Sequence, residues 1–108
     1  EIATAAELKL RVAFVVFNDR AQGVLKLQQK FLYGGKVYAS HTYPMDFCKF
    51  AESLGINCVR IDDRRELETG LEKCIYGSNG PCIADVVINP DAVPVPITRQ
   101  LMAIFRRR

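Results

Sequence analysis

The stretch Val12-Ala13-Phe14-Val15-Val16-Phe17-Asn18-Asp19 decides the fold class of this chain. Residues 12–17 are all apolar and mostly β-branched or aromatic, and Asn18-Asp19 closes the run. A continuous apolar run of this length is typical of a strand that is buried on both faces, as in a parallel sheet. We therefore expect residues 12–17 to form a buried parallel strand that ends at Asn18.

Two more apolar segments, residues 58–61 and 82–88, predict further strands, and helical patterns separate the three. A helix is expected over residues 21–33 with a stop at Gly34-Gly35, another after Pro44, and a third that begins at Asp63-Arg64-Arg65-Glu66. This order indicates an α/β fold, a parallel sheet with right-handed helical crossovers. Three parallel strands leave two edges unpaired, so we expect an incomplete domain. The expected buried stripe of the third helix is Leu67, Leu71, Cys74 and Ile75.

Composition and charge exclude several classes of protein. The chain is 49% hydrophobic and 25% charged, close to an average globular domain, and no apolar run approaches the ~20 residues of a membrane span. The net charge of +3 is spread along the sequence, and Arg106-Arg107-Arg108 accompanies no nucleic-acid motif. Nucleic-acid binding is therefore not expected.

The cysteines and the amino terminus bear on the compartment. Cys48, Cys58, Cys74 and Cys82 match neither a C-x-x-C motif nor zinc-ligand spacing. We expect small buried apolar side chains in a reducing compartment, with a Cys58–Cys82 disulfide as the alternative. No secretory signal is present, so a cytoplasmic location is predicted, with an organelle as the alternative. The chain starts inside an expected helix at Glu1, which suggests a cut chain.

The candidate site is the loop Asn18-Asp19-Arg20-Ala21-Gln22-Gly23, directly after the first strand. Ligands of open parallel sheets bind outside the carboxyl ends of the strands. Asn18 offers an amide oxygen, and Gly23 lets the backbone approach a ligand closely. The loop is suited to a metal and phosphate site, although an ordinary turn is the alternative from these residues alone.

A series of short segments then follows the order found in a known family. The segments are Glu1-Ile2-Ala3-Thr4-Ala5, Asn18-Asp19, Gln22-Gly23, Tyr38, Ser40-His41-Thr42, the run from Asp46-Phe47-Cys48 to Leu54-Gly55, Val59-Arg60, Glu66-Leu67, Gly80-Pro81 and Asp85-Val86-Val87. The series resembles the C-terminal half of the thiamine-diphosphate-binding domain of acetolactate synthases, pyruvate oxidases and related 2-oxo-acid decarboxylases. It assigns residues 1–91 to this half-domain and leaves 92–108 as an extended, proline-containing tail with a short terminal helix.

The resemblance implies a cofactor site in the full-length parent enzyme. Asn18 matches an asparagine that binds Mg²⁺ through its side chain, and the family's main-chain carbonyl ligand falls on Arg20. Gln22, Gly23 and Val24 are then the cofactor-binding residues, with Val24 facing the thiazolium and the substrate. Asp19 departs from the common second asparagine, and Val24 from the methionine of many acetolactate synthases, so the substrate class stays open.

The resemblance also implies that this chain alone is not catalytic. The family's Gly-Asp-Gly, which supplies the charged magnesium ligand, would precede Glu1, and the activating glutamate comes from another domain. Binding of thiamine diphosphate and Mg²⁺ by the chain alone is therefore expected to be weak or absent. No catalytic residue is assigned here, and the expected partners are the remainder of the parent, in a homo-oligomer, and a 2-oxo acid.

Several functions remain open at this point. Acetolactate synthase-like decarboxylation with carboligation comes first, with pyruvate oxidase or an aryl 2-oxo-acid decarboxylase as alternatives. A free-standing, non-catalytic half-domain that serves assembly is the alternative from another class. A generic nucleotide-binding domain is disfavoured because no G-x-G-x-x-G or Walker sequence is present. His41, the single histidine, is given a structural or surface role.

Overall fold

A computed structural model describes residues 1–40, 43–92, 99 and 103 of the chain. It divides the chain into two compact units, Glu1–Asn18 with Met45–Ile88 and Asp19–Pro44 with Asn89–Arg108. The first unit contains a sheet with helices, and the second contains a single long helix among its described residues. No helix of the described residues is both long enough and apolar enough to cross a membrane.

The first unit is built on a parallel sheet of three strands, β1 (Ala13–Asn18), β2 (Asn57–Ile61) and β3 (Cys82–Val87), in the order β1-β3-β2. Both pairings are parallel, with Val16 and Arg60 each opposite Asp85. The expected strands and their parallel arrangement are confirmed. The third strand in sequence takes the central position and is buried along nearly its whole length.

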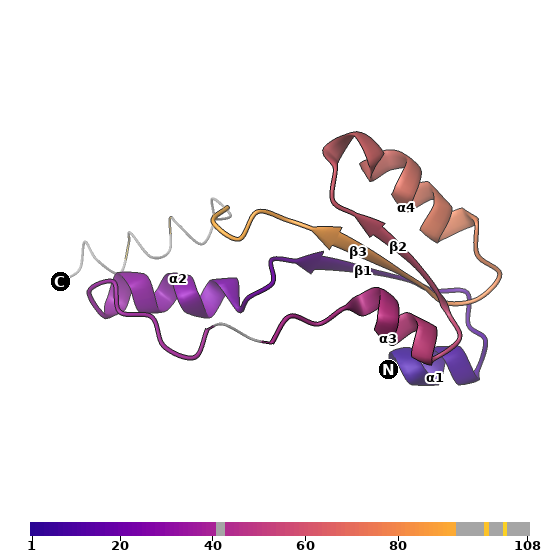
Figure 1. The fold of residues 1–108 in the computed structure, drawn as a ribbon, viewed down its shortest axis with the longest axis horizontal. Helices are drawn as coiled ribbons and strands as arrows, with labels where there is room; N and C mark the ends of the chain where they lie inside the picture. The colour runs from indigo at the N-terminus through magenta and orange to yellow at the C-terminus, as the bar shows by residue number, and fades with distance from the viewer. Residues whose placement is uncertain (41–42, 93–98, 100–102, 104–108) are drawn as a thin grey trace. The chain divides into compact units, whose positions relative to one another are not determined.

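Helices cover the sheet on both sides (Figure 1). Helix α4 (Leu67–Tyr76), which follows the short 3₁₀ turn η1 (Arg64–Glu66), lies on one side, and α3 (Phe47–Ser53) and α1 (Ile2–Glu7) lie on the other. The side chain of Asp63 accepts from the amide of Arg65 at the start of η1, so the expected cap is present. The α/β fold class follows directly from this arrangement.

The main core lies between α4 and the sheet. Gly70 permits this packing, because a Cβ atom there would lie 2.7 Å from Cδ1 of Ile61. The expected stripe of α4 is only partly right: Leu71 and Cys74 pack against the core, but Leu67 and Ile75 are exposed. The fully buried positions of α4 are Gly70 and Cys74, four residues apart, so the buried stripe is centred on them. The buried residues of this core are Ile61, Cys74, Cys82, Ala84 and Val86.

Strand β1 departs from the prediction that it is buried on both faces. Val15 and Phe17, which lie on the same face, are 41% and 72% exposed. β1 is an edge strand, and α4 packs on β2 and β3 instead. The apolar run therefore predicted the strand correctly. It could not predict that the face of β1 with Val15 and Phe17 has no helix of the described residues packed over it.

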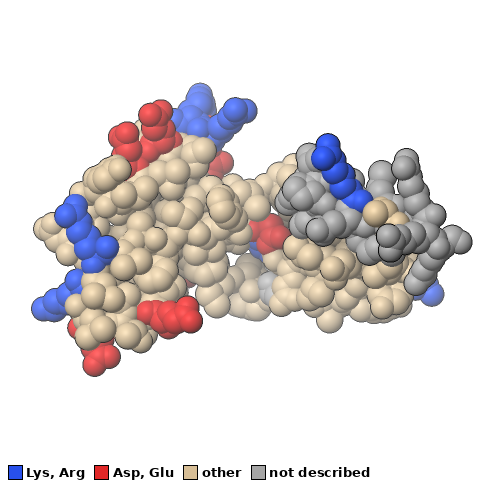
Figure 2. Space-filling model, turned by 180° about the vertical axis from the view of Figure 1, so that it is seen from behind, with Lys and Arg blue, Asp and Glu red and all other residues tan. Residues whose placement is uncertain are grey.

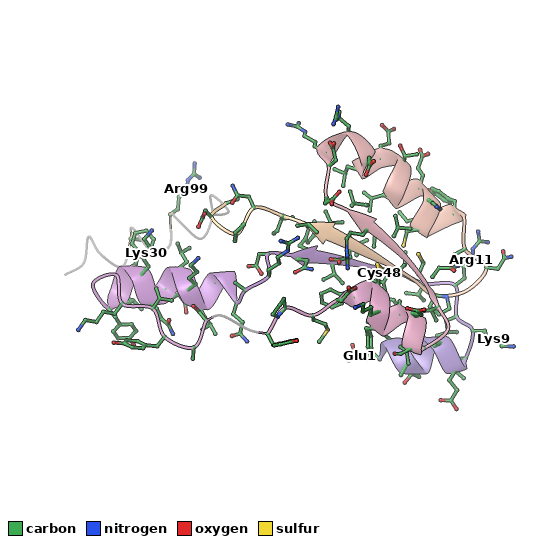
Figure 3. All side chains as sticks on the ribbon, in the orientation of Figure 1. Glu1, Lys9, Arg11, Lys30, Cys48 and Arg99 are labelled. Atoms are coloured by element: carbon green, nitrogen blue, oxygen red, sulfur yellow. A yellow bond between two sulfur atoms is a disulfide. The ribbon has the colours of Figure 1, made fainter. Side chains whose placement is uncertain are left out.

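The cysteine predictions are corrected. Cys48 and Cys58 form a disulfide with a Cα–Cα distance of 5.2 Å, so they are not free thiols, and Cys58 does not pair with Cys82. Cys48 lies at the start of α3, on the side toward the sheet (Figure 3), and the bond ties that helix to β2. Cys74 and Cys82 are free and buried, as expected. Burial, with a hydrogen bond to Cys82, raises the pKa of the Cys74 thiol to about 12.

The second unit contains α2 (Gly23–Leu32), which confirms the helix expected over residues 21–33. It ends before Gly34 and Gly35, whose φ angles of 62° and 84° favour glycine. None of the α2 residues is buried. His41, the arginines 106–108 and most of the short terminal helix expected within residues 92–108 lie outside the described residues.

Charged side chains of both signs are interspersed on the face of the first unit that is seen in Figure 2. This distribution agrees with the spread of charge along the sequence.

Candidate cofactor and metal site

A buried carboxylate lies at the centre of the sheet, near the carboxyl ends of its strands. Asp85 is 1% exposed, although it occupies the central strand and has apolar residues on either side in the sequence. Charged side chains are almost never fully buried unless they are paired. Each oxygen of Asp85 indeed has its own partner: Oδ1 accepts from Asn18 and Oδ2 accepts from Arg60.

Asn18, the expected metal ligand, is held from two directions. Its main-chain carbonyl accepts from the amide of Ile88 at 3.0 Å, and its side-chain Nδ2 donates to Asp85 at 2.9 Å. The parallel register explains the second bond: Val16 is opposite Asp85, and Asn18, two residues further on, projects from the same face. This hydrogen bond directs the side-chain nitrogen of Asn18 toward Asp85. The side-chain oxygen of Asn18 is therefore on the branch that does not face Asp85.

Arg60 connects this pair to helix α3. Its Nε lies 3.3 Å from Oδ2 of Asp85, and its Nη2 lies 2.7 Å from Oδ1 of Asp46. Asp46 is the N-cap of α3 and also accepts from the amides of Cys48 and Lys49. The Lys49 amide, assisted by the positive charge of Arg60, holds the pKa of the Asp46 carboxyl below its ordinary value of 3.8. A chain of polar contacts thus runs from α3 through β2 and β3 to the end of β1.

The loop that follows β1 is organised in the second unit by Asp19. Its two oxygens accept from the amides of Ala21 and Gly23, both at 3.0 Å. A Cβ atom on Gly23 would lie 2.3 Å from Oδ2 of Asp19. A larger residue at position 23 would therefore displace the Asp19 carboxylate, whereas the sequence suggested only the approach of a ligand. Arg20, between them, has a φ of 57°, the left-handed conformation.

The remaining candidates lie at the start of α2. Gln22 is the N-cap residue, and its amide donates to the carbonyl of Ser40 at 3.0 Å. Gly23 is the first helical residue, and Val24, which follows, is 52% exposed. The helix has ten residues, and its amino end carries the positive end of the helix dipole, which favours an anionic group such as a diphosphate.

The donor set can be compared with what Mg²⁺ prefers. An asparagine oxygen and a main-chain carbonyl are hard, neutral oxygen ligands of the kind that Mg²⁺ accepts, but it usually also takes one or two carboxylates. Among residues 1–40 and 43–92, no group of three or more His, Cys, Asp or Glu side chains is placed to hold a metal ion. The side-chain oxygen of Asn18 and the main-chain carbonyl of Arg20 are therefore donors of the neutral kind, and neither supplies the negative charge of a carboxylate ligand.

The sequence did not predict the residues that hold the side chain of Asn18, which are Asp85, Arg60 and Asp46. Asp85 was read as part of an apolar strand, and Arg60 and Asp46 only as members of a series of family-like segments. One signal was present: a single charge in the middle of an otherwise apolar segment, residues 82–88, is unusual and calls for a partner. The identity of that partner depends on strand order, which the sequence did not give.

Known proteins resemble this chain over most of its length. Residues 1–86 match the family model described as "Thiamine pyrophosphate enzyme, C-terminal TPP binding domain". A probable acetolactate synthase large subunit of Methanocaldococcus jannaschii is 34% identical over 97 residues, 88% of this chain and 16% of that protein. The mitochondrial acetolactate synthase catalytic subunit of Aspergillus candidus is 27% identical over 97 residues, 90% of this chain and 14% of that protein.

A third relative carries a more general name. The putative thiamine pyrophosphate-containing protein YdaP of Bacillus subtilis is 27% identical over 99 residues, 91% of this chain and 17% of that protein. The chain thus spans 14% to 17% of the length of these relatives. The family match covers far more than half of the chain. The chain belongs to the thiamine pyrophosphate enzymes, and residues 1–86 are part of their C-terminal TPP-binding domain.

Proposed function

We propose that this chain is part of a thiamine-diphosphate-dependent enzyme that decarboxylates a 2-oxo acid such as pyruvate and joins the product to an acceptor, as acetolactate synthase does. The named relatives support this choice of reaction, since two of the three described above are acetolactate synthases. The proposal concerns the whole enzyme, because the chain corresponds to 16% of its M. jannaschii relative. By itself the chain is proposed to be inactive.

We infer a specific contribution of the chain to the cofactor site. The amide oxygen of Asn18 and the main-chain carbonyl of Arg20 are proposed as two ligands of Mg²⁺, and the start of α2, from Gln22 to Val24, as the segment beside the cofactor. The observation that carries this assignment is the hydrogen bond from Nδ2 of Asn18 to buried Asp85, which gives the amide a defined orientation at the carboxyl end of a strand.

The chemistry that depends on these residues is positioning. Thiamine diphosphate, when bound, would supply a thiazolium ring that can serve as nucleophile and as electron sink for the decarboxylation of a 2-oxo acid. Asn18 and Arg20 would hold a metal ion that offsets the charge of the diphosphate, and the amino end of α2 would add a favourable dipole. Val24 follows directly and is proposed to restrict the space beside the thiazolium. The chain itself moves no proton in this scheme.

The exposed face of β1 supports a larger assembly. Val15 and Phe17 present apolar surface on an edge strand of a parallel sheet, and such sheets are normally covered on both faces. We propose that another part of the parent enzyme covers them. A homo-oligomer is part of the same proposal and is tested by the size of the purified parent in solution.

Replacement of Asn18 tests the metal assignment in the full-length parent. Asn18→Ala removes a ligand that water replaces without holding the loop, a loss of ~2–3 kcal/mol, so cofactor affinity should fall roughly 30- to 150-fold. Arg20→Lys is the matched control and should change the affinity little, because only the main-chain carbonyl of Arg20 is assigned. Calorimetric titration of thiamine diphosphate with Mg²⁺ measures both. If Asn18→Ala lowers the melting temperature and leaves the affinity at the parental value, Asn18 is only a turn residue.

A further inference from the structure

The position of Asp85 is not explained by the stability of the sheet. A buried ion pair usually adds no more to the stability of the folded state than well-packed apolar residues of similar volume would, and it often adds less. The other buried side chains of β3 are apolar or small, and an apolar residue at position 85 would continue the core without a cost of desolvation. A carboxylate at this point of the central strand therefore calls for a role that an apolar side chain could not perform.

That role follows from what a carboxylate can and cannot do. An ionised carboxylate only accepts hydrogen bonds, whereas an asparagine amide has a donor branch and an acceptor branch of nearly the same shape. Asp85 can therefore bond only to the nitrogen of Asn18, at 2.9 Å, and the reversed amide would set oxygen against oxygen. A neutral partner such as asparagine would accept either orientation.

The carboxylate is itself prevented from turning. Its second oxygen is bound by Nε of Arg60, and the guanidinium is bound in turn to Asp46 at the start of α3. The Cys48–Cys58 disulfide ties the same helix to the same strand, two residues before Arg60. Asp85 thus has one oxygen committed to Arg60 and one to Asn18.

We propose that Asp85 is a positioning residue for the cofactor metal, which fixes the amide of Asn18 so that it presents its oxygen, and not its nitrogen, to Mg²⁺. The inference rests on the proposed function of Asn18 and extends it to a residue that need not touch the metal or the cofactor. Arg60 supports Asp85 in this role by holding the other carboxylate oxygen.

The test is a double-mutant cycle on metal affinity in the full-length parent. Mn²⁺ serves as the probe, titrated with saturating thiamine diphosphate and followed by electron paramagnetic resonance. Asp85→Asn should weaken Mn²⁺ binding about tenfold, a loss of the size of a charge-assisted hydrogen bond. In the Asn18→Ala background the same change should have no further effect, because the amide on which Asp85 acts is gone.

Asp63→Asn is the matched control. Like Asp85, Asp63 is a carboxylate that is bound by an arginine and lies in the same unit, but its described partners do not include Asn18. Its replacement removes the same charge and should change Mn²⁺ affinity less than about twofold, the level of a screened surface charge. Urea unfolding of each variant separates affinity from stability.

The outcomes are distinct. Parental affinity in Asn18→Ala overturns the metal assignment and this inference together. A loss in Asn18→Ala with parental affinity in Asp85→Asn, or additive losses in the double variant, overturns the positioning role alone. If Asp85→Asn does not fold, Arg60→Gln takes its place, since the Arg60 side chain is 44% exposed. It should weaken Mn²⁺ binding severalfold only when Asn18 is present, and equal losses in both backgrounds would contradict the proposal.

Discussion

The unit around the sheet and the unit that carries α2 differ in what they bury. In the first, β3 is enclosed and Ile83, Ala84 and Asp85 are almost completely inaccessible to solvent. In the second, α2 has apolar residues such as Leu25 and Phe31, yet none of its residues is buried. The first unit has its own source of stability, whereas the apolar side of α2 needs a surface that the described residues do not provide.

The two helix starts show the same difference in another way. Helix α3 begins at Asp46, whose side chain caps two amides and also binds Arg60. The N-cap residue of helix α2 is Gln22, whose side chain makes no capping hydrogen bond. The amide of Gly23, the first helical residue, donates instead to Asp19 in the preceding loop. The residues proposed to touch the cofactor therefore lie where local contacts dominate, and those that orient Asn18 lie where long-range contacts dominate.

The largest expected effect comes from truncating one apolar residue in each unit. Ile83→Ala removes a fully buried side chain and should lower the free energy of unfolding by ~2–5 kcal/mol, because a cavity remains. Leu25→Ala, at a position of α2 that is 45% exposed, should change it by less than about 0.5 kcal/mol. Urea unfolding followed by circular dichroism measures both. Equal losses would mean that α2 is packed as tightly as the sheet.

A smaller effect is expected from reducing the disulfide, which affects only the first unit. Cys48 and Cys58 are separated by 10 residues, and opening a loop of this length should cost about 2–3 kcal/mol. Urea unfolding with and without a phosphine reductant measures the change. The Cys48→Ser/Cys58→Ser variant should be insensitive to the reductant. A parental chain that is equally stable in both conditions would show that the bond does not contribute.

The smallest effect is a pH dependence at the cap of α3. The pKa of Asp46 is lowered in the folded state, so the stabilisation by its carboxylate is fully present above 3.8 and is lost as the pH falls through the lower, folded value. An NMR titration of the Asp46 carboxyl carbon should therefore give a midpoint below 3.8. Arg60→Gln should raise the midpoint only in part, because the Lys49 amide still donates. A midpoint at or above 3.8 in the parental chain would contradict the contacts described.

Local sequence predicted most of the elements but not their burial. The apolar runs, glycine stops and capping residues placed three strands and the main helices within a few residues, because these signals act between neighbours in the chain. The same runs could not show that Val15 and Phe17 face outward, since the exposure of an edge strand depends on which helices cover it. The pairing of Cys48 with Cys58 was also missed, because it depends on how helix α3 packs against β2.

The candidate site also has one part that the sequence could predict and another that depends on the tertiary structure. The sequence by itself determined the fold class, the family resemblance and the loop from Asn18 to Gly23, because each depends on residue types in a fixed order. Only the tertiary structure decided that β3 lies between β1 and β2 and that Val16 and Arg60 share a register with Asp85. That register brings together groups 67 and 25 residues apart, and no local pattern specifies such a contact because it depends on how the whole sheet is assembled.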